Sequence, residues 1–324
     1  MTEGKNRTLP DWPQQTLRGH KLQGSRYSSR EFFEKEWEGM WTKVWLLLGR
    51  EQEMPDPGNW QREDVGPESF LMVRQDGGSV RAFYNVCQHR GARLVTAPKG
   101  KANRFVCPYH AWAWTRDGEL DFVQDAEDFP AGDPCGKLQL EEVRCETFAG
   151  FIWINMDKDC VGLREFLGPV WDDWKGYGIE KWKRYFARTT TAPFNWKVVL
   201  DNFNESYHVP TVHRARGSEE EKKRYHPGID TDYRNTRFDL SNEGHNRMIM
   251  KGGYAGPAIN AEGIIGEPLA SVMREWGINP EDFKHRGEDT RVALQNAKRS
   301  LGPGRGYDHY AHMADEQLTD ALHY

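Results

Sequence analysis

The stretch CQHRGARL, residues 87–94, places Cys87 and His89 two positions apart and turns at once into Arg-Gly. A second stretch, CPYHAW, begins at Cys107 and adds His110. Seventeen residues separate His89 from Cys107, and strand-like text, RAFYNV or NRFV, precedes each stretch. One hairpin therefore brings the two stretches together. The sequence predicts four metal ligands on two loop tips at one end of a small β domain.

Two thiolates and two imidazoles can hold either a zinc ion or a cluster of iron and sulfide. A zinc finger usually pairs Cys with Cys and His with His, whereas each loop here contributes one of each. The mixed order suits a two-iron cluster in which Cys87 and Cys107 bind one iron and His89 and His110 bind the other. Imidazole in place of thiolate raises the reduction potential of such a cluster. Zinc is the alternative.

The composition of the chain indicates a globular protein large enough for two domains. Of 324 residues, 37% are hydrophobic and 12% aromatic, which supports a full core. The net charge of −5 comes from intermixed charges without a basic stripe, so we expect no nucleic-acid partner. The apolar run VWLLLG is too short to span a membrane, and MTEGKNRTLP does not have the order of a secretory signal. We expect a cytoplasmic protein with no membrane partner.

The texture of the sequence divides the chain into three parts. Residues 1–45 form an N-terminal helical segment, which we assign to the catalytic domain. Residues 46–157 show short alternating runs separated by DGG and DGE, which are typical of antiparallel strands with hairpin turns. Residues 158–324 mix helical and strand-like text. We expect a β domain at 46–157 and a catalytic domain of mixed content at 158–324.

An aromatic stripe predicts a helix between residues 31 and 45. Phe33, Trp37, Trp41 and Trp45 follow one another at steps of four positions and so share one helical face. We expect this face to belong to the core.

Several shorter signals fall in the second half of the chain. Helices are predicted at Arg164–Lys175 and Lys197–Tyr207, and the run RNTRFDL predicts a strand. The charge run SEEEKKR is expected to be a solvated surface. GPGRG has neither the strand nor the helix that would make it a nucleotide-binding loop, so we expect a turn.

The stretch NWKVVLDNFNESYHVPTVH contains a second set of candidate ligands. On a helix, Asp201, Glu205 and His208 share one face, because they fall at positions i, i+4 and i+7. Pro210 weakens the helix, so we expect His213 on a distorted or following turn that still faces His208. Two imidazoles with room for one carboxylate form the ligand set of non-haem Fe(II) oxygenases.

Together the motifs resemble those of a known family. Cys-x-His-Arg-Gly followed by Cys-Pro-Tyr-His-x-Trp is similar to the Rieske [2Fe-2S] motif of ring-hydroxylating oxygenases. Residues 201–213 resemble the mononuclear-iron motif of the large (alpha) subunits, Asp/Glu-x3-Asp/Glu-x2-His-x4-His. The resemblance covers residues 32–324. It implies an α+β protein, with an all-β Rieske domain inserted before an α+β helix-grip (START-like) catalytic domain.

The resemblance also implies roles for individual residues. His208 and His213 are expected to bind mononuclear Fe(II), beside the Rieske [2Fe-2S] cluster of the first motif. Glu205 takes the position of the carboxylate that bridges an iron-ligand histidine to a Rieske histidine of the neighbouring subunit. Many family members have Asp there, and Glu is typical of some branches, including oxygenases that act on quaternary amines such as carnitine. Asn202 is expected to add a polar contact beside this site.

The resemblance breaks at the end of the chain. The family's catalytic domain finishes with further strands and a helix bearing a third iron ligand, Asp or Glu. Here the text ends at DEQLTDALHY, which reads like the approach to another strand. Asp315, Glu316 and Asp320 are the less favoured candidates for this ligand. We expect a C-terminally truncated catalytic domain with the carboxylate beyond Tyr324.

The function implied is that of a terminal oxygenase, an oxidoreductase that receives electrons from a separate reductase or ferredoxin. It would use O2 to hydroxylate or dihydroxylate an aromatic substrate, as in aromatic hydrocarbon catabolism. A monooxygenase that demethylates or cleaves a C–N or C–O bond of a quaternary amine or aryl ether is the second expectation. A homotrimer, with or without a small beta subunit, is the implied assembly. A zinc-stabilised non-enzymatic binding module and a Rieske protein for electron transfer alone are the remaining alternatives.

Overall fold

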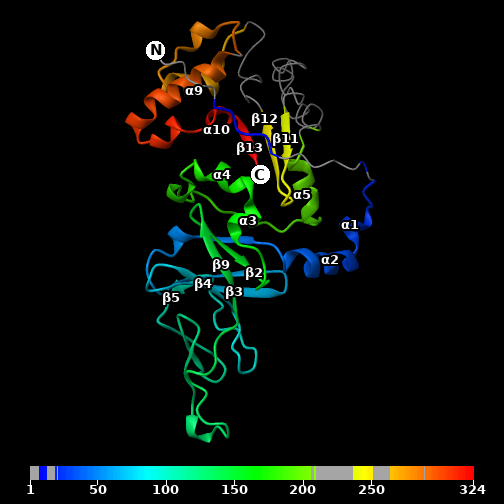
Figure 1. Ribbon diagram of the computed structural model, residues 1–324, viewed down its shortest axis with the longest axis vertical. Coiled ribbons are helices and arrows are strands. Elements are labelled where there is room, and N and C mark those ends of the chain that lie inside the picture. The colour runs from blue at the N-terminus through cyan, green and yellow to red at the C-terminus, as the bar shows by residue number, and fades with distance from the viewer. Residues whose placement is uncertain are drawn as a thin grey trace. The chain divides into compact units, whose positions relative to one another are not determined.

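The computed structural model forms two compact units (Figure 1). The mixed unit lies within residues 1–28, 167–178 and 188–324, and the β unit comprises residues 29–166 and 179–187. The expected fold class is confirmed, with a β-rich unit and a unit of mixed α and β content. The domain boundaries at 45 and 157 stay predictions. The structure describes residues 7–12, 19, 21–205, 208, 236–250, 263–287 and 289–324.

An antiparallel sheet of seven strands, in the order β1-β10-β9-β4-β3-β2-β5, forms the main layer of the β unit. These strands agree with the alternating runs of the sequence, and β9 and β10 meet at the Ala149-Gly150 turn, where both residues have positive φ. The strands are β1 Leu46–Arg50, β2 Asn59–Val65, β3 Glu68–Arg74, β4 Val80–Tyr84, β5 Lys99–Lys101, β9 Glu142–Phe148 and β10 Phe151–Asn155.

Strand β3 is buried on both faces and contributes side chains to two hydrophobic cores. Because side chains alternate along a strand, Phe70 and Met72 enter one core and Leu71 and Val73 enter the other. The second core also contains the side chains of both candidate cysteine ligands and of Trp112. The loops of the candidate cluster are therefore built on one face of this central strand.

A smaller sheet of three strands supports the second loop. It consists of β6 Arg104–Val106, β7 Ala113–Thr115 and β8 Leu120–Phe122, in that order. Strands β6 and β7 pair in antiparallel register from Arg104 opposite Thr115 to Val106 opposite Ala113. The residues between these strands, 107–112, are those of the CPYHAW motif, so the motif occupies the tip of a hairpin.

The helical predictions are confirmed only in part. Helix α2, Arg30–Glu36, continues as a π-helical turn, η1, at Trp37–Trp41, and Trp45 is buried beyond the helix. Phe33 is 42% exposed, so the prediction that the aromatic stripe faces the core is wrong at this residue. The β unit also contains three short 3-10 turns, η2 Glu51–Glu53, η3 Ala126–Asp128 and η4 Ile179–Lys181.

The predicted helix at Arg164–Lys175 is broken into α3, Leu163–Leu167, and α4, Pro169–Lys175. Gly168 between them has φ 48° and ψ −125°, which is a conformation that favours glycine. A Cβ atom at this position would lie 2.7 Å from the Glu243 carboxyl group. The break therefore has a local cause, a glycine followed by a proline at the first helical position.

Helices and a sheet of three strands, β11-β12-β13, form the mixed unit. The predicted strand in RNTRFDL is confirmed as β11, and the strand expected near the end is confirmed as β13. GPGRG forms a 3-10 turn, as expected of a turn. None of the helices in the described part of the chain has the length and apolar character needed to span a bilayer. The elements are α1 Ser25–Ser28, α5 Trp196–Phe203, β11 Thr236–Leu240, β12 Asn246–Met250, α8 Leu269–Glu275, η7 Pro280–Phe283, α9 Asp289–Leu301, η8 Pro303–Arg305, η9 Asp308–Ala311, α10 Asp315–Thr319 and β13 Ala321–His323.

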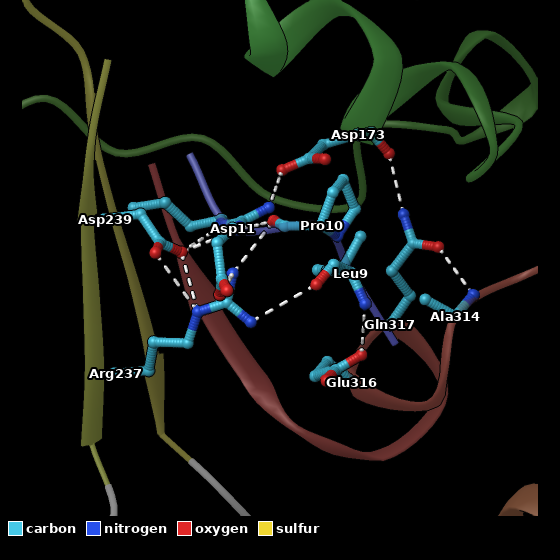
Figure 2. A network of polar contacts seen from close by, with 10 residues as sticks. Leu9, Pro10, Asp11, Asp173, Arg237, Asp239, Ala314, Glu316 and Gln317 are labelled. Atoms are coloured by element: carbon cyan, nitrogen blue, oxygen red, sulfur yellow. Dashed lines mark hydrogen bonds and ion pairs between the residues drawn. The ribbon is translucent and has the colours of Figure 1, made fainter. Parts of the chain in front are cut away.

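A fully buried guanidinium, that of Arg247 on β12, lies at the centre of this unit. Its Nε and Nη2 atoms donate to the Asp239 carboxylate at 3.0 and 2.6 Å, and its Nη1 atom donates to Asp173 at 2.5 Å. Nη2 also donates to the carbonyl of Pro10 at 2.8 Å, and the guanidinium packs 4.5 Å from the Trp12 ring centroid. Figure 2 shows Asp173, Asp239 and Pro10 gathered around this point. A buried cation of this kind is tolerated because every side of it is paired.

The same network holds residues 9–11 in place within the mixed unit (Figure 2). Arg237 donates to the Pro10 carbonyl at 2.8 Å, and the Leu9 amide donates to Glu316 at 2.8 Å. Gln317 donates to the Asp173 carbonyl at 2.8 Å. Residues that are far apart in the sequence are therefore joined through hydrogen bonds to backbone atoms as well as through ion pairs.

We predict that Arg247→Met destabilises the protein by about 3–5 kcal/mol, because it leaves the buried Asp173 and Asp239 carboxylates without their cation. Arg274→Met is the matched control, since Arg274 pairs with Glu267 at 2.9 Å on the exposed surface. Its expected cost is about 0–1 kcal/mol. Urea unfolding of both variants measures the difference. Equal unfolding free energies would contradict the central role of Arg247.

Candidate metal centres

The first candidate loop is closed by two backbone hydrogen bonds. The Gly91 amide donates to the Cys87 carbonyl at 3.0 Å, and the Cys87 amide donates to the Ala92 carbonyl at 2.8 Å. Gly91 has φ 73°, and this left-handed conformation explains the glycine of the motif. The chain thus reverses within six residues and projects the side chain of His89 from the tip.

The second loop repeats this pattern. The Ala111 amide donates to the Cys107 carbonyl at 3.0 Å, and the Cys107 amide donates to the Trp112 carbonyl at 2.8 Å. Ala111 has φ 57°, a conformation that costs a residue with a Cβ atom about 1–2 kcal/mol. The same turn is therefore built twice, and the second copy is retained despite its strain.

Like side chains meet where the two loops come together. The Cys87 and Cys107 side chains are 1% and 3% exposed and hydrogen-bond to each other. The ring centroids of His89 and His110 lie 4.8 Å apart at an interplanar angle of 61°. The structure thus brings all four predicted ligands together, as a thiol pair and an imidazole pair.

The environment changes the proton affinity of the ligands. Burial raises the pKa of the Cys87 thiol, and the hydrogen bond with Cys107 raises it further. Desolvation lowers the pKa of His89, and the neighbouring charges of His110 and Arg90 lower it further. Without metal, the surroundings therefore favour the neutral thiol of Cys87 and the neutral imidazole of His89, and metal binding has to release the Cys87 proton.

The donor set fits a cluster with two ligands on each metal. The Nδ1 atom of His110 is buried and has no hydrogen-bond partner in the protein, so this nitrogen is left for a ligand. Among the residues that the structure describes, no three His, Cys, Asp or Glu side chains surround one point that could hold a single metal ion. The pairing of thiol with thiol and imidazole with imidazole suits two irons, whereas a single zinc ion needs four ligands on one centre.

The second motif begins on helix α5. The Asn195 side chain caps this helix by accepting from the Lys197 amide at 3.0 Å. The helix ends at Phe203, so the prediction that it continues to Tyr207 is wrong at Asn204 and Glu205. Asn204 leaves helical geometry with ψ 14°, and its side chain accepts from Asn246 of β12 at 2.7 Å. A tertiary contact thus coincides with the end of the helix.

The side chains of Glu205 and His208 are in contact. The His208 amide donates to Oε2 of Glu205 at 3.1 Å, and Nδ1 of His208 contacts Oε1 of the same carboxylate. The Asp201 carboxylate turns to the N-terminal segment, where it accepts from the Tyr27 hydroxyl at 2.6 Å. Asn202 is exposed on α5. His213, the other predicted iron ligand, lies outside the described residues.

The three carboxylates considered for the third iron position all have partners within the mixed unit. Asp315 pairs with Arg299 at 2.6 Å, and Glu316 accepts from the Leu9 amide. Asp320 accepts two hydrogen bonds from the Arg291 guanidinium, both at 2.7 Å. Each of these groups therefore has a role in packing, and their assignment as iron ligands stays a prediction.

Sequence reasoning missed the aromatic rings that support the histidines. The Trp112 ring lies parallel to that of His89, with centroids 4.6 Å apart and an interplanar angle of 5°. The Tyr109 ring lies 3.9 Å from that of His110, tilted by 31°. Both residues belong to the CPYHAW motif, but nothing in the spacing indicates that Trp112 reaches the histidine of the other loop.

Comparisons with known proteins agree with this geometry. Residues 44–132 match the family model described as Rieske [2Fe-2S] domain. Residues 179–324 match the model described as ring hydroxylating alpha subunit (catalytic domain). The first matched region contains the four candidate cluster ligands, and the second contains Glu205, His208 and His213.

Two curated relatives illustrate the range of similar proteins. The carnitine monooxygenase oxygenase subunit of Escherichia coli (strain K12) is 32% identical over 208 residues, which cover 61% of this chain and 54% of the relative. The large oxygenase component of the 2,4-dinitrotoluene dioxygenase system of Burkholderia sp. (strain RASC) is 35% identical over 200 residues, 58% of this chain and 43% of the relative. The matches thus span about half the length of these relatives.

Solved structures show the same two groups. A quaternary ammonium Rieske monooxygenase in complex with an inhibitor has a TM-score of 0.59 at 28% identity, covering 70% of this chain and 60% of that one. Naphthalene 1,2-dioxygenase with indole bound has a TM-score of 0.60 at 26% identity, covering 90% of this chain and 61% of that one. The fold is therefore shared with both monooxygenases and dioxygenases.

We predict that His110→Cys lowers the reduction potential of the cluster by hundreds of millivolts, toward the value of about −400 mV that is typical of four thiolate ligands. Thiolate adds negative charge where imidazole had none. Gln88→Cys is the control, because it adds a thiol beside the site at an exposed position and keeps the imidazole. Redox titration measures the potential. An unchanged potential with an intact cluster in His110→Cys would exclude this residue as a ligand.

Proposed function

We propose that this chain, which belongs to the family of Rieske oxygenase large subunits, is the terminal component of an oxygenase and receives electrons from a separate reductase or ferredoxin. The observation that carries the proposal is the convergence of Cys87, His89, Cys107 and His110 on two matching loops. The contact between Glu205 and His208 in the same chain supports a second centre. The proposed location of the enzyme is the cytoplasm.

Each set of residues has a distinct role in this proposal. The two buried cysteines hold one iron of a Rieske cluster and the two histidines hold the other, while His208 and His213 hold a mononuclear Fe(II). When bound, the cluster supplies single electrons and the Fe(II) supplies O2 activation. Glu205 orients the His208 ring through its carboxylate and so fixes the nitrogen that faces the metal. Asn202 is proposed to add a polar contact near this site.

The proposed substrate is a quaternary amine. Several relatives are named carnitine or glycine betaine monooxygenase oxygenase subunits. The carboxylate position beside His208 is Glu, which the resemblance of the motif gives as typical of branches that include oxygenases of quaternary amines. Hydroxylation of a carbon bonded to the nitrogen gives an alcohol whose C–N bond then breaks to release an amine and an aldehyde. One oxygen atom of O2 enters the substrate, and the other leaves as water with two electrons from the reductase and two protons.

Dihydroxylation of an aromatic ring is the second candidate. It is supported by the similarity to the large oxygenase component for 2,4-dinitrotoluene and by the naphthalene 1,2-dioxygenase structure, which covers 90% of this chain. Both atoms of O2 would then enter one product, a dihydrodiol, with two electrons from the reductase and two protons. The two candidate reactions use the same metal centres. They differ in whether one or both oxygen atoms of O2 enter the organic product.

We predict that His213→Ala abolishes O2-dependent turnover and removes one iron per chain, while the absorption and EPR signals of the cluster persist. The reason is that only the mononuclear centre loses a ligand. His312→Ala, at an exposed histidine of the same unit, is the control and keeps both. Iron analysis and product analysis after addition of reductant, O2 and glycine betaine, carnitine or naphthalene provide the measurement.

Formation of an amine and an aldehyde from betaine or carnitine would support the first candidate. Formation of a diol from naphthalene would support the second. Wild-type turnover rates in His213→Ala would refute the assignment of the mononuclear centre. Zinc in place of iron and sulfide in the purified full-length protein would favour the binding-module alternative, and a cluster without the additional iron would favour electron transfer alone.

We further propose that the working assembly is a homotrimer closed head to tail, with Glu205 at the junction between subunits. A similar solved structure, of a quaternary ammonium Rieske monooxygenase, is described as giving insight into inter-subunit electron transfer. A ring provides one identical interface to every subunit. In this arrangement Glu205 would contact His208 on its own chain and His89 or His110 of the neighbour. A small beta subunit is a further expectation that size measurements test.

We predict that Glu205→Gln retains both metal centres but slows electron transfer between them by at least about tenfold, equivalent to ~1.4 kcal/mol. The amide is nearly isosteric, but it removes the charge and replaces one acceptor with a donor. Glu281→Gln, at an exposed position of the mixed unit, is the control. Rapid mixing of the reduced protein with O2 and substrate measures the rate. An unchanged rate, or full activity of a monomer, would refute the junction.

A further inference from the structure

The indole of Trp112 connects the two candidate ligand loops. Its backbone carbonyl accepts from the Cys107 amide at 2.8 Å within the second loop. Its ring stacks on His89 of the first loop, 4.6 Å between centroids at an angle of 5°. The residue is 7% exposed and packs on its other sides against Trp114 and Phe129, with centroids 6.2 and 6.0 Å away. The indole is thus held in a fixed place and presents one flat face to His89.

The other histidine has a different neighbour. The ring of His110 lies against the ring of Tyr109, and Tyr109 is 56% exposed. The guanidinium of Arg90 lies 5.4 Å from the Tyr109 ring centroid on this open side. Water therefore reaches the phenol beside the half-buried His110, whereas the indole that stacks on one face of the otherwise exposed His89 belongs to the core. The two imidazoles are inequivalent although the backbones of their loops match.

We infer that Trp112 is a positioning residue that holds the His89 imidazole flat and keeps the reduction potential of the cluster lower than it would otherwise be. The inference rests on the proposed function, because it requires His89 to be a cluster ligand. Tyr109, by contrast, has little influence on the potential. The difference between His89 and His110 therefore arises from the side chains around the loops and not from the loop backbones.

Two physical effects of the indole both lower the reduction potential of the cluster. Reduction makes the cluster more negative, and water stabilises added charge better than an apolar ring does, so shielding by the indole disfavours the reduced form. The π face of the indole also attracts the positive charge that a metal-bound imidazole carries, which favours the oxidised form. Removing the indole reverses both effects. The potential should therefore rise.

The test measures the reduction potential and the EPR spectrum of the reduced cluster in Trp112→Leu, Trp112→Phe and Tyr109→Leu. We expect Trp112→Leu to shift the one-electron equilibrium constant at least tenfold toward reduction, which is about 59 mV. Trp112→Phe keeps a stacking ring, so it should lie between wild type and Trp112→Leu. Tyr109→Leu likewise replaces an aromatic ring beside a candidate ligand histidine with Leu and should stay within the error of the wild-type value.

The outcomes separate this inference from the proposed function. A wild-type protein without iron and sulfide would overturn the proposed function and this inference with it. A wild-type cluster with unchanged potentials in both Trp112 variants, or a Tyr109→Leu shift equal to that of Trp112→Leu, would overturn this inference alone. If Trp112→Leu does not retain its cluster, Trp112→Phe is compared with Tyr109→Phe. An unchanged potential in Trp112→Phe, or an equal shift in both variants, would then overturn this inference.

Discussion

The ion cluster around Arg247 closes the mixed unit across an interruption in the chain. This unit is made from three stretches of sequence, and Arg247 receives a partner from each of them: Pro10 from the first, Asp173 from the second and Asp239 from the third. The β unit occupies the chain between these stretches, with residues 29–166 between the first and second and residues 179–187 between the second and third. A single buried cation with several acceptors therefore joins these distant segments, because losing a carboxylate would leave charge unpaired in the core and losing the Pro10 carbonyl would remove an acceptor from a buried guanidinium.

The candidate cluster is held together by a different kind of constraint. Each loop is closed by hydrogen bonds within six residues, and its side chains rest on a core shared with strand β3. The fold has only to bring two hairpin tips together. Local geometry then buries the cysteine of each loop, whereas His89 is exposed and His110 is half-buried. Strain at Ala111 is the cost of repeating this turn without a second glycine.

This difference explains what the sequence could predict. The four ligands of the cluster and the strands around them follow from short-range spacing, turn residues and alternation, and the structure brings those residues together. The end of α5 could not be predicted in the same way, because it coincides with a contact from Asn204 to Asn246, forty-two positions away. The partners of Arg247 are equally invisible, since Pro10 lies 237 positions away. The helix predicted over residues 164–175 runs through a Gly-Pro pair at 168–169, and the structure breaks the helix there.

The two proposed centres therefore depend on the rest of the chain to different degrees. The ligand loops of the β unit are specified locally, and the rings that distinguish His89 from His110 come from the second loop itself. The helix that leads to Glu205 and His208 is instead fixed by distant residues, with Tyr27 bonded to Asp201 and Asn246 bonded to Asn204. Tyr27 stands two positions before Ser29, where the chain enters the β unit. The contact that anchors this helix thus joins two residues of the mixed unit that the β unit separates in the sequence, so the proposed iron site depends on long-range contacts that the ligand loops of the cluster do not need.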